Sequence, residues 1–371
     1  MPLKRSDLVD VGAAFDLAGA EPQVFAVGGA TVALGTAATV VIAGAVDDPA
    51  AGGVWNDQEL RLQGPAPVLA AARLTGVVPC GSAELDTDLP VHLFARVDGL
   101  CCYLGLVRPS GSAWTDGELN SCELAIDPPL SREILDIVRP TVAPPGLPGL
   151  GWLDHVDSEP GWALELFVTG WHPEAVEPQA VGEIPRSIPP ALADFYRLAA
   201  RYPGILGGQN RIRSVGAVRP DSSAGFLVFA DENQGGWDWS IPWEVDATNS
   251  DPAVWVGELG GAAVLEQEPL SRYLLQFSLY EAASTAPFTA ALRNFPKHLL
   301  PVLGPCLQGV PLRTFMAPVA PTDFLVGPGI VAGVSPSYFN EDEVDVWIGA
   351  RHRSALHPLL ELGLQWQRFD G

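Results

Sequence analysis

Lysine is almost absent from this chain, occurring only at positions 4 and 297. The 21 lysine and arginine residues face 44 aspartate and glutamate residues, which leaves a formal net charge of −23 at pH 7. Both residues 1–140 and residues 141–371 share this acidic excess. An acidic protein repels phosphate backbones and anionic membrane surfaces, so neither nucleic acid nor membrane is expected as a partner. A basic protein would be attracted.

Signatures of common enzymes and metal proteins are also missing. The phosphate-binding pattern GxxxxGK and the serine nucleophile pattern GxSxG do not occur, and no Cys-x-x-Cys pair or histidine is spaced for zinc. We therefore expect no cofactor and no metal. The odd number and irregular spacing of the cysteines are typical of reduced thiols, and the first ten residues lack the apolar core of a signal peptide. Together these features favour a cytoplasmic protein. The cysteines are Cys80, Cys101, Cys102, Cys122 and Cys306.

One uncharged segment, residues 22–46, is long enough to span a membrane. Glycine, alanine, threonine and valine dominate it, and the glycines at Gly28-Gly29, Gly35 and Gly44 divide it into pieces of strand length. This pattern favours two or three buried strands over a membrane segment.

The segment Arg139–Gly151 (RPTVAPPGLPGLG) contains four prolines and cannot hold a helix or a central strand. It predicts a β-rich domain over residues 1–140, a Pro/Gly linker over 141–151 and a second domain over 152–371. A second proline-rich stretch, residues 301–328, is interpreted as a long ordered connection inside the second domain.

The best-defined part of the first domain is a hairpin over Val91–Val107. Asp98-Gly99 is a strong two-residue turn signal, because both turn positions need φ > 0. The predicted register pairs Val97 with Leu100, Ala95 with Cys102, Leu93 with Leu104 and Val91 with Leu106, all on one apolar face. Cys102 should therefore lie in the core, and a reactive thiol at Cys101 is not favoured. A short helix over 131–138 is expected to close this domain.

The second domain mixes helices and strands without regular alternation, so we predict an α+β fold. Helical spacing marks residues 188–202 and 354–362, the latter capped by Gly363. A helix over 269–283 is apolar nearly all round and should be well buried. Short strands are expected at residues 225–230, 237–241, 253–256, 344–350 and 364–369.

The stretch Phe229–Trp239 (FADENQGGWDW) carries the candidate site. A glycosidase needs two carboxylates about 5–9 Å apart, one with a raised pKa. Asp231 or Glu232 with Asp238 could supply them, with tryptophans as sugar platforms (Trp237, Trp239 and Trp243). However, Asn233-Gln234-Gly235-Gly236 is typical of a turn between strands, where acids and amides bond their own backbone. Glu281, in the buried helix, is expected to pair with an arginine or to cap a loop.

Several segments of the second domain resemble the SUKH superfamily, in particular its actinobacterial, yeast cell-wall-assembly-regulator-like members. These segments are IPPALADFYRLAARYP, QNRI, GFLVFADENQGGWDW, DPAVWV, EPLSRYLLQFSLYEA and the terminal VDVWIGARHRSALHPLLELGLQW. The resemblance covers about residues 150–371 and implies a mostly antiparallel sheet flanked by helices. It also implies a non-enzymatic role, since many bacterial members are thought to be immunity proteins that neutralise toxins, often nucleases. No resemblance covers residues 1–140.

We therefore expect a non-enzymatic, protein-binding chain that contacts a basic toxin domain through an acidic surface. The expected contact residues combine acids with aromatic anchors: Asp231, Glu232, Asn233, Trp237, Trp239 and Asp246. Two alternatives remain open. One is a carbohydrate-active hydrolase that uses Asp231 or Glu232 with Asp238, and the other is a sugar-binding or small-molecule-binding module in residues 1–140.

Overall fold

The computed structural model describes residues 3–27, 29–44, 53–63, 74, 89–115, 118–138, 146–172, 175–177, 184–185, 188–221, 225–243, 251–258, 263–316 and 320–371. It divides the chain into two compact units. Residues 1–142 with Asp370 form the first, and residues 143–369 with Gly371 form the second. The break at 142/143 falls inside the proline-rich segment that predicted a linker. The fold is mixed α+β with mostly antiparallel sheets, as expected.

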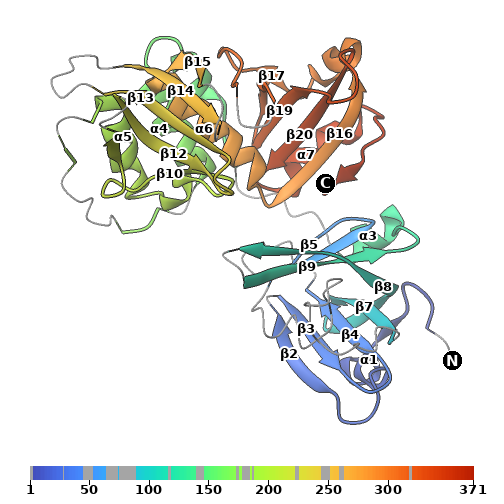
Figure 1. Ribbon diagram of the computed structural model, residues 1–371. Helices are drawn as coiled ribbons and strands as arrows, with labels where there is room; N and C mark the ends of the chain where they lie inside the picture. Colours follow the sequence, from blue (N-terminus) through green and yellow to red (C-terminus); the bar gives the residue numbers. More distant parts are fainter. Residues whose placement is uncertain are drawn as a thin grey trace. The chain divides into compact units, whose positions relative to one another are not determined.

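The first unit is built on one nine-stranded sheet with the order β2-β3-β4-β7-β8-β9-β6-β5, and β1 pairs with β8 (Figure 1). Among the described strands of this unit, β4 and β7 are the only pair that runs parallel. The strands are β1 (Leu8–Val9), β2 (Gln23–Val27), β3 (Ala30–Leu34), β4 (Thr39–Ala43), β5 (Gly53–Trp55), β6 (Glu59–Gln63), β7 (Val91–Val97), β8 (Leu100–Thr115) and β9 (Glu118–Ile126).

The uncharged segment forms β2, β3 and β4. The prediction of two or three buried strands is confirmed for β3 and β4, whereas β2 is mostly exposed. Every residue of β4 is buried, because successive side chains enter different cores. Val41 belongs to one core cluster, which helix α3 (Arg132–Val138) covers. Val40 belongs to the other, which helix α1 (Val11–Asp16) covers. A strand covered on both faces reads as a continuous apolar run, which explains its likeness to a membrane segment. None of the helices in the described residues is long and apolar enough to cross a membrane.

The hairpin of β7 and β8 forms as predicted, with φ of +48° at Asp98 and +83° at Gly99. The predicted pairs of Val97 with Leu100 and Ala95 with Cys102 are confirmed. Beyond them a β-bulge shifts the register, so that Leu93 faces Gly105 and Val91 faces Val107.

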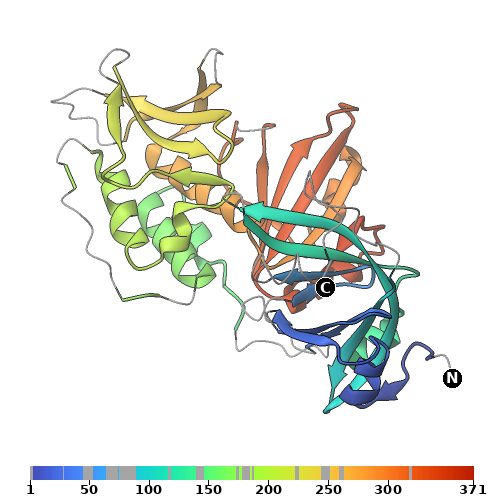
Figure 2. The same cartoon turned by 60° about the horizontal axis from the view of Figure 1, so that its bottom comes forward.

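The predicted pairs of Leu93 with Leu104 and of Val91 with Leu106 are therefore wrong. Leu104 is the extra residue of the bulge, and the adjacent Gly105 adopts φ +120°, a conformation that favours glycine. The shift turns Val107 into the core and leaves Leu106 half-exposed. Figure 2 shows the result, a long β8 that curves together with β9.

The second unit holds two six-stranded, antiparallel sheets, where the sequence predicted one. The first has the order β10-β12-β13-β14-β15, with β11 beside β12. Its strands are β10 (Asn210–Ile212), β11 (Arg219–Asp221), β12 (Phe226–Glu232), β13 (Trp237–Pro242), β14 (Ala253–Glu258) and β15 (Val264–Pro269). Helices α4 (Pro160–Trp171), α5 (Pro190–Ala199) and α6 (Leu270–Ser284) share its core, next to short 3-10 turns η2 (Gly151–His155) and η3 (Pro203–Leu206).

The second sheet has the order β17-β18-β19-β20-β16-β21. Its elements are β16 (Phe288–Pro296), the 3-10 helix η4 (Lys297–Leu303), β17 (Gln308–Gly309), β18 (Asp323–Gly327), β19 (Ile330–Pro336), β20 (Glu343–Ala350), α7 (Arg353–Leu360) and β21 (Arg368–Phe369). The interpretation of residues 301–328 as a connection is wrong in part, because they include β18, a strand with a neighbour on each side.

Helix α6 lies between the two sheets of this unit, which explains why it is apolar nearly all round (Figure 1). It packs against α4 and α5 and also against β15, β19 and β20. Tyr273 contacts Phe229 of the first sheet at a ring-centroid distance of 5.7 Å, and Tyr280 contacts Trp347 of the second at 5.1 Å. Phe315 lies against both tyrosines, at 5.7 and 5.6 Å. One aromatic cluster thus joins both sheets through α6.

The aromatic cluster gives a test of how the second unit is held together. Phe315 is fully buried, so Phe315→Ala should lower the free energy of unfolding by about 3–5 kcal/mol, through lost burial and a cavity. Urea denaturation measures this. The same change at Phe339, which is 85% exposed, is the matched control and should cost less than about 0.5 kcal/mol. Equal effects at the two positions would contradict the assigned packing.

Candidate functional site

The FADENQGGWDW stretch forms β12, a tight turn and β13, as the turn interpretation predicted. Gly235 adopts φ +74° in the turn. Glu232 is 9% exposed, and its Oε2 accepts hydrogen bonds from the backbone N–H groups of Gln234 (2.9 Å) and Gly236 (3.2 Å). Glu232 therefore stabilises the turn and is not available as a freely exposed contact residue.

Asp231 lies on the opposite face of β12 from Glu232, since neighbouring side chains of a strand alternate. Both of its carboxylate oxygens accept hydrogen bonds from Arg213, the bond from Nε to Oδ2 measuring 2.6 Å. Such a two-pronged arginine pair is stronger and more directional than an ordinary hydrogen bond. Asp231 and Arg213 are each about one-third exposed, at 37% and 31%. This ion pair reaches the surface beside the turn.

Asp238 faces Asp231 directly across the β12–β13 ladder. Burial raises the pKa of Asp238, and the negative charge of Asp231 raises it further, while Arg213 opposes both effects. The two aspartates and the arginine therefore form one electrostatic group on one face of the sheet. Two neighbouring carboxylates, one of them with a raised pKa, are what the hydrolase alternative requires.

The two tryptophans of the stretch differ in exposure. Trp239 is fully buried, and its Nε1 donates to Glu266 Oε1 at 3.2 Å. The expectation that Trp239 contacts a partner is therefore wrong, because its side chain fills the core between the sheet and α6. Trp237 and Trp243 are half-buried and pack against the same core. Trp237 keeps part of its ring at the surface.

The remaining expected contact residues are less constrained. Asn233 is exposed, and its Nδ2 donates to Gln209 Oε1 at 3.4 Å. Asp246 lies outside the described residues. The expected contact patch thus reduces to Asp231, Asn233 and the exposed part of Trp237, next to Arg213 and Asp238.

Three further glutamates are buried, and each holds backbone N–H groups. Glu281 was expected to pair with an arginine or to cap a loop. It caps a loop, accepting bonds from Gly208, Gln209 and Asn210 at 2.7–2.9 Å. Glu266 accepts from the N–H of Met316 at 2.9 Å, and Glu268 from that of Arg313 at 2.8 Å. These last two bonds tie β15 to the segment that leads into β18. The sequence of β15 gave no sign that Glu266 and Glu268 are buried, because a glutamate in a strand is normally expected to face solvent.

The described cysteines are not activated. Burial raises the pKa of the thiols of Cys101 and Cys102 and raises that of Cys122 to about 12. These raised pKa values agree with the two expectations for this pair, that Cys102 lies in the core and that Cys101 is not a reactive thiol.

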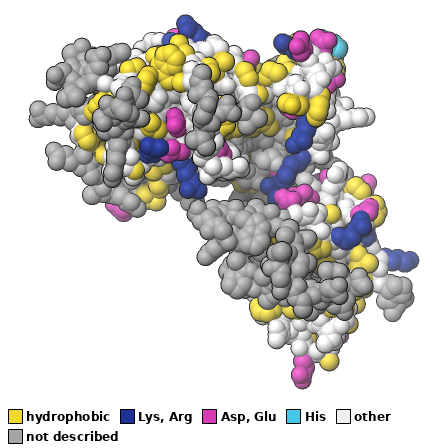
Figure 3. All heavy atoms as spheres, viewed as in Figure 1, with side chains coloured by type: hydrophobic (Ala, Val, Ile, Leu, Met, Phe, Trp, Pro, Cys, Tyr) yellow, Lys and Arg dark blue, Asp and Glu magenta, His cyan; other side chains and the backbone are white. Residues whose placement is uncertain are grey.

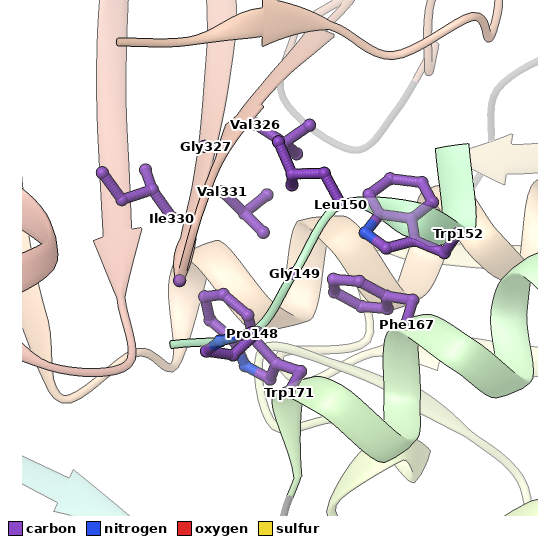
Figure 4. A pocket seen from close by; sticks show the side chains of 11 residues that line it. Pro148, Gly149, Leu150, Trp152, Phe167, Trp171, Val326, Gly327, Ile330 and Val331 are labelled. Atoms are coloured by element: carbon purple, nitrogen blue, oxygen red, sulfur yellow. The ribbon is translucent and has the colours of Figure 1, made fainter. Parts of the chain in front are cut away.

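Two cavities of the second unit lie away from the acidic stretch. One, between α4 and the β18–β19 hairpin, has a volume of about 10 Å³ and an apolar lining that includes Trp152, Phe167 and Trp171 (Figure 4). It can hold no more than about one water molecule. The other is a groove of about 600 Å³ between α4 and α5, with Leu274 of α6 also lining it. Its residues include Trp162, Arg197 and Arg201.

Comparisons with known proteins add no identification, since no family model, no curated protein and no solved structure matches this chain.

Glu266 predicts a pH dependence of stability. Burial raises its pKa in the folded protein from 4.5 to about 7. Between these values the folded state binds more protons than the unfolded state, so stability falls as pH rises from about 4.5 to 7 and then levels off. Glu266→Gln cannot lose a proton and should remove up to about 3 kcal/mol of this decline. Urea denaturation at pH 5 and pH 8 measures it. Glu341→Gln, the same change at an exposed acid, should leave the slope intact. An unchanged slope in Glu266→Gln would contradict the assignment.

The group around Asp231 makes a second prediction. Asp231→Asn removes a negative charge beside Asp238 and frees Arg213 to interact with it, so the pKa of Asp238 should fall. Arg213→Gln should raise it. Carboxyl carbon chemical shifts followed by NMR through a pH titration report the value directly. A pKa that does not respond to either change would show that the three side chains are not coupled.

Proposed function

We propose that this chain is a non-enzymatic protein-binding module, of the immunity type that neutralises a basic, nuclease-type toxin domain in the cytoplasm. The proposal includes membership of the SUKH superfamily for the second unit, with the first unit as an additional module. Neither a nucleic acid nor a membrane is included among its partners. The α+β architecture and the mostly antiparallel strand pairing support this proposal, whereas the second sheet goes beyond the single sheet that the SUKH resemblance implies.

The observation that carries the proposal is the way the acids of FADENQGGWDW are used. Asp231 forms an ion pair with Arg213, Glu232 accepts hydrogen bonds from the turn, and Trp239 is buried in the core. One of the three candidate sugar platforms, Trp239, and one of the candidate carboxylates of a hydrolase, Glu232, are therefore committed to the fold. What the chain presents in excess is negative charge, with a net of −23. A nuclease must be basic to hold its substrate, so an acidic inhibitor would be steered to it and would compete for the same surface.

A carbohydrate-active hydrolase is the second candidate, favoured by one specific observation, the facing pair Asp231 and Asp238. In this proposal Asp238, whose pKa burial raises, is the general acid and Asp231 is the second carboxylate. Arg213 holds Asp231 in place through two hydrogen bonds.

The binding proposal is tested with the full chain as bait in extracts of its host and of competing bacteria. A recovered protein is identified, prepared in pure form and titrated against the chain. We expect a basic protein whose dissociation constant rises at least tenfold between 50 and 200 mM salt, because screening weakens long-range attraction. We also expect its nuclease activity to stop at a stoichiometric ratio.

The same preparation separates the two candidates. Two results together would overturn the binding proposal. One is that the extracts yield no bound protein, and the other is that the wild-type chain turns over members of a glycan panel at a rate that Asp238→Asn reduces at least 100-fold. Asn233→Ala, a neighbouring exposed change, is the control that should leave such turnover intact.

A further inference from the structure

The most exposed large hydrophobic side chains of the described residues are two neighbours, Tyr338 and Phe339. They are 92% and 85% exposed, while the next such side chain, Leu8, is 53% exposed. Single exposed hydrophobic residues are common on proteins, but adjacent aromatic rings held almost wholly in water are costly. The two rings contact each other edge to face at 5.3 Å. They lie in the loop between β19 and β20.

This loop is held in one conformation by its polar residues and not by its aromatic rings. Ser337 N–H donates to the carbonyl of Glu343 at 3.0 Å, and Ser337 Oγ donates to Asn294 Oδ1 at 2.8 Å. Asn340 accepts from the N–H of Asp342 through Oδ1 and from that of Glu343 through its carbonyl. The rings make none of these bonds. Their place in solvent is therefore not explained by the needs of the turn, and the loop is already ordered for binding, which lowers the entropy cost of association.

The surroundings of the rings are acidic. The loop carries Glu341, Asp342 and Glu343 and no basic residue. Asp342 also accepts, through its carbonyl, the N–H of Lys297, which fastens the loop to η4 at 2.9 Å. Lys297 and Arg293 offset part of the negative charge. Figure 3 shows acidic, basic, hydrophobic and histidine side chains gathered at one end of the second unit.

The neighbouring helix η4 extends this apolar surface. Leu299 and Val302 are 38% and 36% exposed. We define the aromatic tip as Tyr338 and Phe339 with the acids Glu341 and Asp342. Its composition is that of an interface hot spot, with aromatic anchors inside a charged rim.

We propose that the aromatic tip is the docking element for a basic protein partner, which receives Tyr338 and Phe339 in an apolar pocket rimmed by arginine or lysine. This inference rests on the proposed function as a protein-binding module and moves the main anchor from the FADENQGGWDW turn to the β19–β20 loop. The negative charge of the aromatic tip favours a basic protein as the occupant. A second copy of the chain would bring its own acids against these acids, and an anionic membrane would repel them. An arginine rim would also gain cation–π contact with the rings.

The test compares the wild-type chain with the double variant Tyr338→Ser/Phe339→Ser. Both positions are in solvent, so its melting temperature should match that of the wild type. Trp162→Ser, at a tryptophan that is 45% exposed on α4, is the matched control. The probe is the purified basic protein recovered with the wild-type chain, and calorimetry measures its dissociation constant. We expect the double variant to bind at least about 30-fold more weakly and the control to bind within twofold of the wild type.

The other outcomes are distinct. If the basic protein binds the double variant as tightly as the wild type, the aromatic tip is overturned and the proposed function stands. If no protein binds the wild-type chain at micromolar concentration, both are overturned. Sedimentation of the wild type as a dimer and the double variant as a monomer would assign the tip to self-association. Binding of the wild type but not the variant to phosphatidylcholine vesicles would assign it to lipid, and either result would overturn a basic protein as occupant.

Discussion

The second unit depends on the burial of helix α6 from every side. A helix that is apolar nearly all round cannot lie at the edge of a sheet, because part of its surface would remain in water. Here one sheet covers one side, the second sheet covers another, and α4 and α5 complete the enclosure. Gly349 of β20 allows the closest approach, since a Cβ at this position would lie 2.5 Å from the carbonyl oxygen of Ala283 in α6. The need to cover one helix thus explains why this unit has two sheets.

The acids of the unit divide into two groups by what surrounds them. Glu232, Glu266, Glu268 and Glu281 are buried and accept bonds from backbone N–H groups that have no partner in a strand or helix ladder. A buried carboxylate is costly unless such donors satisfy it, and a buried N–H is costly without an acceptor, so each group offsets the cost of the other. Among the less buried acids, Asp251 and Asp345 also accept backbone N–H groups, whereas Glu341 and Asp342 lie exposed at the surface. They supply the surface charge on which the proposed recognition of a basic partner rests.

This division changes how the acid-rich stretch between β12 and β13 is understood. Its residue types suit a catalytic loop, but a catalytic loop must present its acids to a substrate. The fold instead uses Glu232 for the turn and pairs Asp231 with Arg213. The aromatic residues separate in the same way. Trp239 contributes to packing around α6, whereas Tyr338 and Phe339 contribute nothing to packing and remain in solvent.

Local signals in the sequence determined much of the secondary structure of the described residues. The Asp98-Gly99 turn, the buried strands of residues 22–46, helix α6 and the turn at Asn233–Gly236 were all predicted, because each depends on neighbouring residues or on a short-range period. Tertiary structure alone decided the bulge at Leu104, the second sheet and the partners of Glu266 and Glu268. These features depend on contacts between residues far apart in the chain, which no local period encodes. The difference in exposure between Trp239, which is buried, and Phe339, which is not, is likewise decided by tertiary structure. Both are aromatic residues in or beside a strand, and only the position of α6 buries one ring while leaving the other in water.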